Sequence, residues 1–385
     1  MELSAGVPPS DEAPDYRTFD LHGSHAYLGY ALGEADPPFR MQFWWWPPPA
    51  RFADACRDVV HDIHPHLVDE LYAYADAQRL SARALWQQCC RVNLKARLSP
   101  AQPLFSPASS ELAEGCSTFV RFISTRTASG EEMRQVIVGR NYDYLPQQAR
   151  RQRIRFMPDC CANASIGARG SVPCGRYDGL NSQGLFASLH VVMTETPRED
   201  EVKPGVPFHL VLRIALELCR TAREACDLLT RIPHLSSLNY LVADAHDAFV
   251  IEADPRRVRV IERDLAAGSE DTLAVTNHFR HPDMRPLQGN RAFANSECRL
   301  VFLQRQGGRV ETTQERRAAP CFAHPSVDTL LDHASAVMAD RSAPVCGLSG
   351  SLTTLWSCVA ELTTKRIRYA AGPPCFTPYE EMPAF

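Results

Sequence analysis

The chain contains the sequence GCST at residues 115–118, followed by GRNYD at residues 139–143. A small residue, Gly115, precedes Cys116, and a strand-like stretch follows it. This context indicates a self-cleavage point that would turn an internal thiol into an N-terminal one. The freed α-amine would titrate near neutrality, at about 7.7–8.0. Nucleophile and base would then belong to a single residue.

The spacing between the two motifs is that of one hairpin. Arg140 follows Cys116 by 24 residues (140 − 116), so Arg140 and Asp143 are predicted to return beside the thiol. An arginine and a carboxylate in that position can lower the pKa of the thiol and hold the amine. A simpler alternative is an ordinary ion pair between Arg140 and Asp143, with a structural Cys116.

Three later segments carry further polar residues. Residues 178–185 (DGLNSQGL) are predicted to turn into a strand that ends at His190, and residues 295–300 (NSECRL) to begin a helix. Asn277 closes another predicted strand, where its amide could donate to an oxyanion hole. Asn277 could instead cap the strand end, and His190 could be a satisfied core residue.

Composition excludes several classes of protein. The chain has 385 residues, enough for two domains or for one large domain with an appendage, and 45% of them are hydrophobic and 22% charged, as is ordinary for a folded protein. Its net charge of −4 without a basic block argues against nucleic acid as a partner. No apolar run is long enough for a membrane span, and no secretory signal begins the chain, so we expect a cytoplasmic protein whose 14 cysteines are free thiols.

Residues 1–115 are predicted to form a mainly helical region. Apolar residues recur at helical spacing over Leu21–Gly33, over Ala50–Gln78 with an interruption at Pro65, and over Ser81–Leu98. Residues 116–385 are predicted to alternate short strands with helices. The expected strands are Thr118–Ser124, Gln135–Gly139, Leu185–Val192, Asn239–Asp244, Phe249–Ala253, Arg257–Ile261, Thr272–Thr276, Leu352–Cys358 and Arg366–Ala370. The expected helices are Phe208–Arg231, Arg291–Gln306 and Ser326–Met338.

In this order the segments resemble the penicillin acyltransferase family, that is acyl-coenzyme A:6-aminopenicillanic acid acyltransferase and its bacterial relatives. They resemble the choloylglycine hydrolases more distantly. Residues 21–33 (LHGSHAYLGYALG) look like the segment that opens the acyltransferase propeptide. Both families are N-terminal nucleophile hydrolases, so the resemblance implies an α+β fold, a four-layer α/β/β/α sandwich, over residues 116–385. It also makes residues 1–115 a pro-region.

The resemblance assigns roles to matching residues. Cys116 matches the nucleophile, Arg140 and Asp143 match the Arg and Asp beside it, and Asn277 matches the Asn that helps to form the oxyanion hole or to hold the amine. Arg299 matches a late Arg near the site. Choloylglycine hydrolases have an Asn where this chain has His190, which puts bile-salt specificity in doubt. A neutral imidazole could still donate one hydrogen bond there.

Three histidines and a tyrosine complete the expected site. His190, Tyr142 and His278 are predicted to contact substrate, and His281 flanks the same loop as His278. The histidines of residues 61–66 (HDIHPH) suggest a metal, but Pro65 interrupts the helix and the spacing of i,i+4 is missing, so we expect a surface cluster and no metal. No phosphate-binding or dinucleotide motif is present, so no cofactor is expected.

These observations predict a cysteine amidohydrolase that cleaves a linear amide C–N bond through a thioester, after autocleavage at Gly115–Cys116. One alternative is an acyltransferase that moves an acyl group from an amide or thioester donor to an amine. Another is an unprocessed relative that binds an acylated ligand. The expected partner is a small acylated amine or thioester. The acyl chain, the amine and the oligomeric state are not predicted.

Overall fold

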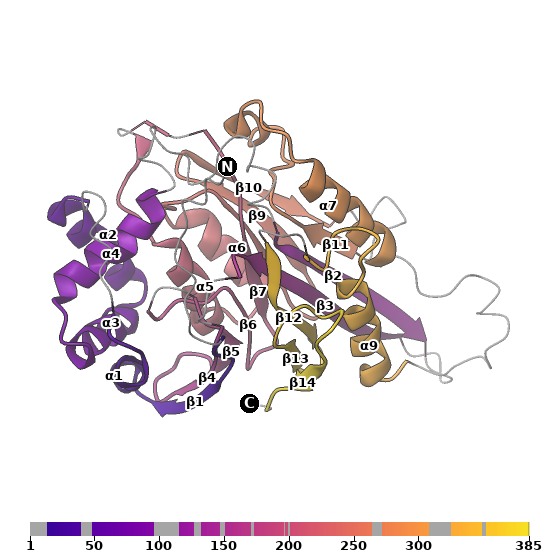
Figure 1. The fold of residues 1–385 in the computed structure, drawn as a ribbon, viewed down its shortest axis with the longest axis horizontal. Helices are drawn as coiled ribbons and strands as arrows, with labels where there is room; N and C mark the ends of the chain where they lie inside the picture. Colours follow the sequence, from indigo (N-terminus) through magenta and orange to yellow (C-terminus); the bar gives the residue numbers. More distant parts are fainter. Residues whose placement is uncertain are drawn as a thin grey trace, which may run out of the picture.

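The computed structural model describes residues 14–39, 48–95, 115–126, 132–146, 151–170, 173–195, 197–198, 201–263, 272–307, 325–348, 352–383 and 385. Two sheets form its centre (Figure 1). The eight-stranded sheet has the order β1-β4-β5-β6-β7-β8-β9-β10, and the six-stranded sheet has the order β11-β2-β3-β12-β13-β14.

The strands of the eight-stranded sheet are β1 (Thr18–Gly23), β4 (Arg153–Pro158), β5 (Ser165–Ala168), β6 (Asp178–Asn181), β7 (Phe186–Val191), β8 (Leu238–Ala243), β9 (Ala248–Asp254) and β10 (Arg257–Glu262). Those of the six-stranded sheet are β2 (Ser117–Arg126), β3 (Glu132–Tyr144), β11 (Thr272–Val275), β12 (Thr353–Glu361), β13 (Arg366–Ala370) and β14 (Tyr379–Glu381).

Helices cover the outer face of each sheet. Helices α5 (Phe208–Leu218) and α6 (Ala222–Arg231) pack on β6 to β10 of the eight-stranded sheet. Helices α7 (Ala294–Gly307) and α9 (Val327–Met338) pack on β2, β3, β11 and β12 of the six-stranded sheet. Apolar side chains of both sheets meet between them, and a second apolar cluster lies under α7 and α9. The predicted four-layer α/β/β/α sandwich is therefore confirmed.

The N-terminal helices lie outside α5. They are α1 (His25–Ala35), α2 (Ala50–Ile63), α3 (Pro65–Ala77) and α4 (Ala82–Lys95), drawn in indigo and violet in Figure 1. The spacing of Gly29 and Gly33 lets α1 lie directly on α3, because a Cβ on Gly29 would stand 2.0 Å from the Glu70 carbonyl oxygen. The expected helices are found, but residues 21–23 belong to β1, which pairs in parallel with β4. The N-terminal segment thus also extends the main sheet.

Two expectations about the middle of the chain are wrong. The single helix predicted over Phe208–Arg231 is two helices, because Thr221 caps a new helix by accepting a hydrogen bond from the Glu224 N–H at 3.1 Å. Residues 178–181, expected as a turn, form the buried strand β6. The turn follows it, where the Asn181 side chain accepts hydrogen bonds from the backbone N–H groups of Gln183 and Leu185.

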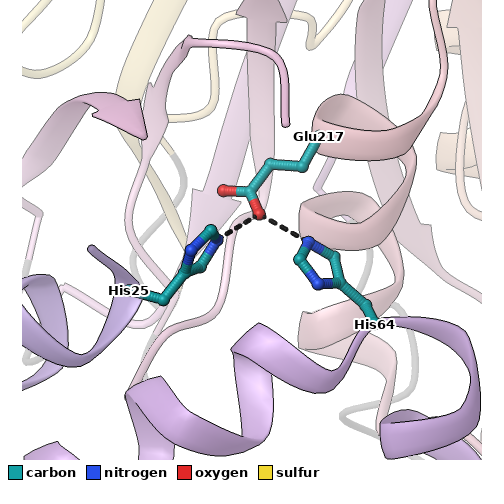
Figure 2. A group of neighbouring side chains, drawn as sticks. All are labelled: His25, His64 and Glu217. Atoms are coloured by element: carbon teal, nitrogen blue, oxygen red, sulfur yellow. Dashed lines mark hydrogen bonds and ion pairs between the residues drawn. The ribbon is translucent and has the colours of Figure 1, made fainter. Parts of the chain in front are cut away.

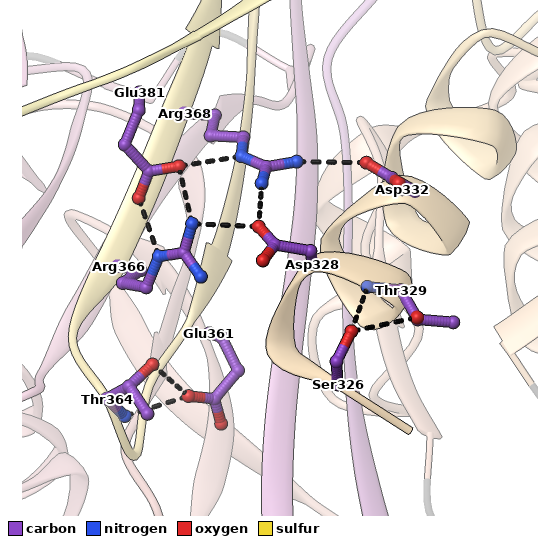
Figure 3. Close-up of polar contacts among 9 residues, drawn as sticks. All are labelled: Ser326, Asp328, Thr329, Asp332, Glu361, Thr364, Arg366, Arg368 and Glu381. Atoms are coloured by element: carbon purple, nitrogen blue, oxygen red, sulfur yellow. Dashed lines mark hydrogen bonds and ion pairs between the residues drawn. The ribbon is translucent and has the colours of Figure 1, made fainter.

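Charged side chains connect α9 to the last two strands (Figure 3). Arg368 of β13 reaches Asp332 of α9 at 2.9 Å and Glu381 of β14 at 2.7 Å. Arg366 makes the parallel pairs with Asp328 and Glu381. The network lies at the surface, so each pair contributes little to stability. No helix in the described part of the chain is both long and apolar enough to cross a membrane.

Candidate active site

Cys116 lies directly before β2 and is 4% exposed. The β2–β3 hairpin pairs Ser117 with Asn141 and Thr118 with Arg140, so the GRNYD motif returns beside the residues that follow Cys116. The backbone N–H of Asp143 donates a hydrogen bond to the Cys116 sulfur, and the charges of Arg140, Asp143 and Arg299 act on it. The predicted return of the motif is confirmed, although the motif is the end of the 13-residue strand β3 rather than a loop after it.

Gly115 packs against Asp143 so closely that no side chain fits. A Cβ on Gly115 would lie 2.2 Å from the Asp143 Cβ and 3.1 Å from its Oδ2. Gly347 approaches the same carboxylate, since its Cβ would lie 3.0 Å from Oδ2. Two glycines therefore let the backbone enclose Asp143, and one of them supplies the carbonyl of the peptide bond before Cys116.

The Asp143 carboxyl group is buried and partly neutralised. The Thr354 hydroxyl donates to its Oδ1 at 2.6 Å, and the Gly347 N–H donates to that hydroxyl at 2.9 Å. Burial raises the pKa of Asp143 to about 7, although Thr354, Arg299 and Arg140 oppose the change. A carboxyl group with this pKa can both accept and return a proton near neutral pH.

Burial also raises the pKa of the Cys116 thiol, and this effect exceeds the lowering by the Arg140 and Arg299 charges. Arg140 does act to lower the pKa of the Cys116 thiol, as expected. The expectation that the pKa of this thiol is lowered overall is wrong, because burial has the larger effect. In the intact chain the sulfur is therefore mainly a thiol at neutral pH, which is a weak nucleophile.

Arg140 pairs with Asp178, not with Asp143. Its Nε donates to Asp178 Oδ2 at 2.8 Å, and its Nη1 lies 3.3 Å from both Thr118 Oγ1 and His190 Nε2. Its Nη2 is buried and has no hydrogen-bond partner among the described residues. A buried cationic donor next to the thiol can thus accept an additional ligand atom.

Arg299 of α7 ties the helix to the start of β2. Its Nη1 donates to the Cys116 carbonyl at 2.7 Å and to Ser117 Oγ at 2.9 Å. Its Nη2 donates to Asn277 Oδ1 at 3.2 Å. Asn277 Nδ2 in turn donates to the Val191 carbonyl at 2.9 Å, which leaves its second N–H for another acceptor. Arg299 therefore positions both the cysteine backbone and the Asn277 amide.

His190 is fully buried between the sheets. Its Nε2 lies 2.8 Å from Thr118 Oγ1 and its Nδ1 lies 3.4 Å from the Asn239 carbonyl. Because a carbonyl only accepts, Nδ1 carries the proton and Nε2 is an acceptor. Burial, followed by the Arg140 charge, lowers the pKa of His190 well below its usual value. His190 therefore holds Thr118 and Arg140, and a direct contact with substrate stays a prediction.

Tyr142 and His278 have separate sets of partners. The Tyr142 ring stacks with Trp356, at 4.0 Å between ring centroids, and with Tyr177, at 5.0 Å between ring centroids, and only 6% of the residue is exposed. His278 Nδ1 lies 2.8 Å from Ser296 Oγ, which also accepts from the Asn277 N–H at 2.8 Å. Burial and nearby arginines lower the pKa of His278 to about 4, so its imidazole is neutral at neutral pH.

A comparison with protein families matches residues 129–372 to the family described as acyl-coenzyme A:6-aminopenicillanic acid acyl-transferase. The chain belongs to this acyltransferase family. The resemblance noted in the sequence is thereby confirmed. The matched range contains Arg140, Asp143, Asn277 and Arg299, and it begins after Cys116, whose assignment rests on its neighbours.

Solved structures of hydrolases are similar to this acyltransferase-family chain at low identity. An N-acylethanolamine-hydrolyzing acid amidase ortholog from Caenorhabditis elegans is 18% identical, with a TM-score of 0.42, over 64% of this chain and 92% of that one. A mutant conjugated bile acid hydrolase from Clostridium perfringens is 14% identical, with a TM-score of 0.42, over 69% and 92%. Penicillin V acylase from Agrobacterium tumefaciens is 15% identical, with a TM-score of 0.35, over 67% and 76%. A search of curated proteins found no match.

Three site residues escaped the sequence analysis of this family member. Asp178 lies in a segment predicted as a turn, but it holds Arg140 from the other sheet. Thr354 and Ser296 are short polar residues whose partners, Asp143 and Asn277, lie far away in sequence. Of these three residues, only Asp178 could have been recognised from the sequence, because it begins a short stretch that contains apolar residues.

The remaining expectations about thiols and histidines have mixed outcomes. The described cysteines are free thiols, as predicted, including Cys346 and Cys375, whose sulfur atoms lie 2.7 Å apart. The expected surface histidine cluster is wrong for His64, which is 1% exposed and contacts Glu217. His61 and His66 do reach the surface.

Proposed function

We propose that this protein is a cysteine amidohydrolase that cleaves a linear amide C–N bond after autocleavage at Gly115–Cys116. One observation carries the proposal. The Gly115–Cys116 peptide bond lies against an Asp143 carboxyl group whose pKa is raised to about 7, with the Cys116 thiol held by the Asp143 N–H. Thiol, carbonyl and a proton acceptor suited to neutral pH thus meet at one bond.

Processing would proceed by attack of the Cys116 sulfur on the Gly115 carbonyl carbon. The Asp143 carboxylate accepts the thiol proton and returns it to the Cys116 nitrogen as the C–N bond breaks. The product is a thioester between Gly115 and Cys116 with a free α-amine. Water then hydrolyses the thioester and releases the Gly115 carboxylate.

In turnover the new α-amine would accept the proton of the Cys116 thiol, and the thiolate would attack the substrate carbonyl. The tetrahedral oxyanion needs donors that the intact protein leaves unused. The second N–H of Asn277 Nδ2 and the Arg140 Nη2 group are two such donors near the thiol. The α-ammonium then protonates the leaving amine, and water hydrolyses the acyl-enzyme thioester.

Acyl transfer is the second candidate, and the family description favours it directly. It shares the acyl-enzyme, and an amine replaces water as the acceptor. The substrate of either reaction would be a small acylated amine or thioester. Tyr142, which lies near Cys116, stacks with Trp356 and Tyr177, but each of the three residues is at most 6% exposed in the intact chain, so contact with an acyl group requires the site to open after processing.

The deciding experiment is the intact mass of the freshly purified protein under denaturing conditions. Wild type should give two fragments that meet at Gly115/Cys116, and Cys116→Ala should give one chain. Cys298→Ala, which removes an exposed thiol of α7, serves as the matched control and should be cut like wild type. A single chain in wild type would remove the α-amine from the mechanism and favour an unprocessed acyl-ligand-binding protein.

The partition of the acyl group separates the two reactions. The processed protein is supplied with amide and thioester substrates in water, with and without an added small amine. Release of free acid alone supports the hydrolase. Rapid formation of a new amide at the expense of the acid supports the transferase.

A further inference from the structure

Three side chains from distant segments meet outside the active site (Figure 2). His25 Nε2 and His64 Nε2 each lie 2.8 Å from the same oxygen, Glu217 Oε2. The three atoms lie within 4.8 Å of one another. His25 begins α1, His64 stands between α2 and α3, and Glu217 belongs to the last turn of α5. The cluster thus joins the N-terminal helices to the helical layer of the sandwich.

The break at Pro65 is what places His64 in this cluster. Pro65 is the first residue of α3, and His64, between the two helices, has a non-helical backbone with φ −150° and ψ 82°. The side chain is thereby aimed away from both helix axes toward α5. In the sequence, Pro65 argued against a metal motif on a continuous helix. In the structure, Pro65 separates two helices and so allows His64 to lie beside Glu217.

The three donors suit a transition metal. Neutral imidazole nitrogen and carboxylate oxygen are the ligands of many zinc sites, at about 2.0–2.2 Å from the ion. His25, His64 and Glu217 are each 3% exposed or less, so their rotamers are held by packing. For the ion to bind both Nε2 atoms, the hydrogen that each ring donates to Glu217 must leave Nε2, with Nδ1 carrying the ring hydrogen instead. Only the proton positions and small shifts of the ligand atoms are needed.

A cavity gives the cluster an open side. It has a volume of about 290 Å³ and is lined by His64, Glu217, His66 and the paired Cys160 and Cys161, among others. A second hollow of about 320 Å³ is lined by His25 and His66. His66 belongs to both, and its ring stacks on His25 at 5.3 Å. The cavities provide an entry path and space for a water or His66 as the fourth ligand.

The surrounding contacts orient Glu217 for a bound cation. Its other oxygen, Oε1, pairs with Arg213, which also donates to both oxygens of Glu70. Two buried carboxylates thus share one guanidinium directly, and the hydrogen-bond partners of Glu217 Oε2 among the described residues are the two imidazoles. Arg213 fixes the orientation of Glu217 and leaves Oε2 for the ion, as outer partners of metal ligands commonly do.

We propose that His25, His64 and Glu217 bind a divalent transition-metal ion, for which Zn²⁺ is the best match. The ion connects residues of the N-terminal helices to α5. Its binding does not depend on cleavage at Gly115–Cys116, and after a cleavage it would hold the two fragments together. The sequence analysis expected no metal, and the proposed site is a testable alternative to that expectation.

Zn²⁺ binding to the full-length protein tests the site. The protein is stripped with a chelator, its accessible thiols are alkylated to remove sulfur ligands, and Zn²⁺ is titrated by calorimetry. We expect one equivalent to bind. His64→Gln should weaken the affinity at least about 100-fold, because its amide can still donate to Glu217 but ligates metals poorly. His61→Gln, at an exposed histidine three residues earlier, should bind like wild type.

A second readout keeps the test independent of folding defects. Zn²⁺ should raise the thermal midpoint of wild type and His61→Gln, and should leave that of His64→Gln unchanged. Co²⁺ bound to the alkylated protein should give a tetrahedral d–d spectrum without a sulfur charge-transfer band. Absence of binding to alkylated wild type, or equal binding by His64→Gln, overturns the proposal and leaves a hydrogen-bonded clamp. If His64→Gln does not fold, His25→Gln with the same readouts decides.

Discussion

Arg140 on β3 donates to Asp178 on β6 at 2.8 Å, and this buried ion pair joins the two central sheets. Asp178 also accepts hydrogen bonds from the indole of Trp356 and the hydroxyl of Tyr369, both from the six-stranded sheet. The guanidinium next to the thiol is therefore oriented from the opposite layer. Asp178 therefore influences the active site indirectly, by fixing the position of the Arg140 guanidinium.

Removal of that carboxylate should be costly. Asp178→Asn leaves the Arg140 charge buried without its partner, and breaking such a pair costs about 3–5 kcal/mol. We expect a loss of this order in the free energy of unfolding, measured with denaturant in the uncleavable Cys116→Ala background. Asp328→Asn, which cuts the surface pairs with Arg366 and Arg368, is the control and should change stability little. Similar stabilities for the two variants would show that Arg140 is held by other groups.

Gly115→Ala should slow autocleavage. Its Cβ would stand 2.2 Å from the Asp143 Cβ, so the scissile peptide or the aspartate must move. Displacements of about 1 Å can reduce the rate of a positioned reaction about 100-fold. The rate is followed by mass after synthesis in a cell-free system. Gly347→Ala would place a Cβ 3.0 Å from Asp143 Oδ2 and should slow autocleavage less. Cleavage of Gly115→Ala at the wild-type rate would contradict the proposed role of the Gly115–Asp143 contact.

The pKa of Asp143 makes the stability of the intact chain depend on pH. The folded pKa of about 7 lies above the ordinary value of 3.8, so between these values the folded state keeps a proton that the unfolded state has lost. Stability from this group is therefore present below about pH 4 and falls as the pH rises to about 7. The whole effect is at most about 4 kcal/mol.

Asp143→Asn should remove this dependence. Unfolding is measured with denaturant at several pH values between about 4 and 8, again in the Cys116→Ala background. The free energy of unfolding of Asp143→Asn minus that of its parent should grow with pH across this window, because only the parent loses stability as the pH rises. A difference that stays constant would show that Asp143 is ionised throughout in the folded state.

The sequence revealed the parts of the site that are local or set by a hairpin. Cys116, Arg140 and Asp143 meet because two adjacent antiparallel strands return to the same edge, and the spacing of 24 residues contains that information (140 − 116). The sequence also predicts the alternating strands and helices of residues 116–385, and the family resemblance implies their arrangement in four layers. The family match then confirmed the resemblance over residues 129–372.

Contacts between layers were beyond reach of the sequence. The Arg140–Asp178 pair and the His64–Glu217 contact depend on how separate sheets and helices pack, and no spacing encodes that packing. Strand β6 has four residues, too few to show a strand period, so the sequence predicts a turn at Asp178. The helix break near Thr221 is hidden because the polar residues on both sides continue the same helical period.

Arg299 offers the last prediction, because it contacts three parts of the site at once. It reaches the Cys116 carbonyl, Ser117 Oγ and Asn277 Oδ1 through two nitrogens of one planar group. A lysine has a single nitrogen and cannot hold these acceptors in one plane. Arg299→Lys should therefore misplace the Asn277 amide and lower kcat about 100-fold, as does loss of one oxyanion donor, with little change in KM. Arg305→Lys, at an exposed arginine of α7, should leave both constants unchanged. An Arg299→Lys protein that raises KM but keeps kcat would place Arg299 in substrate binding, and unchanged constants would exclude any positioning role.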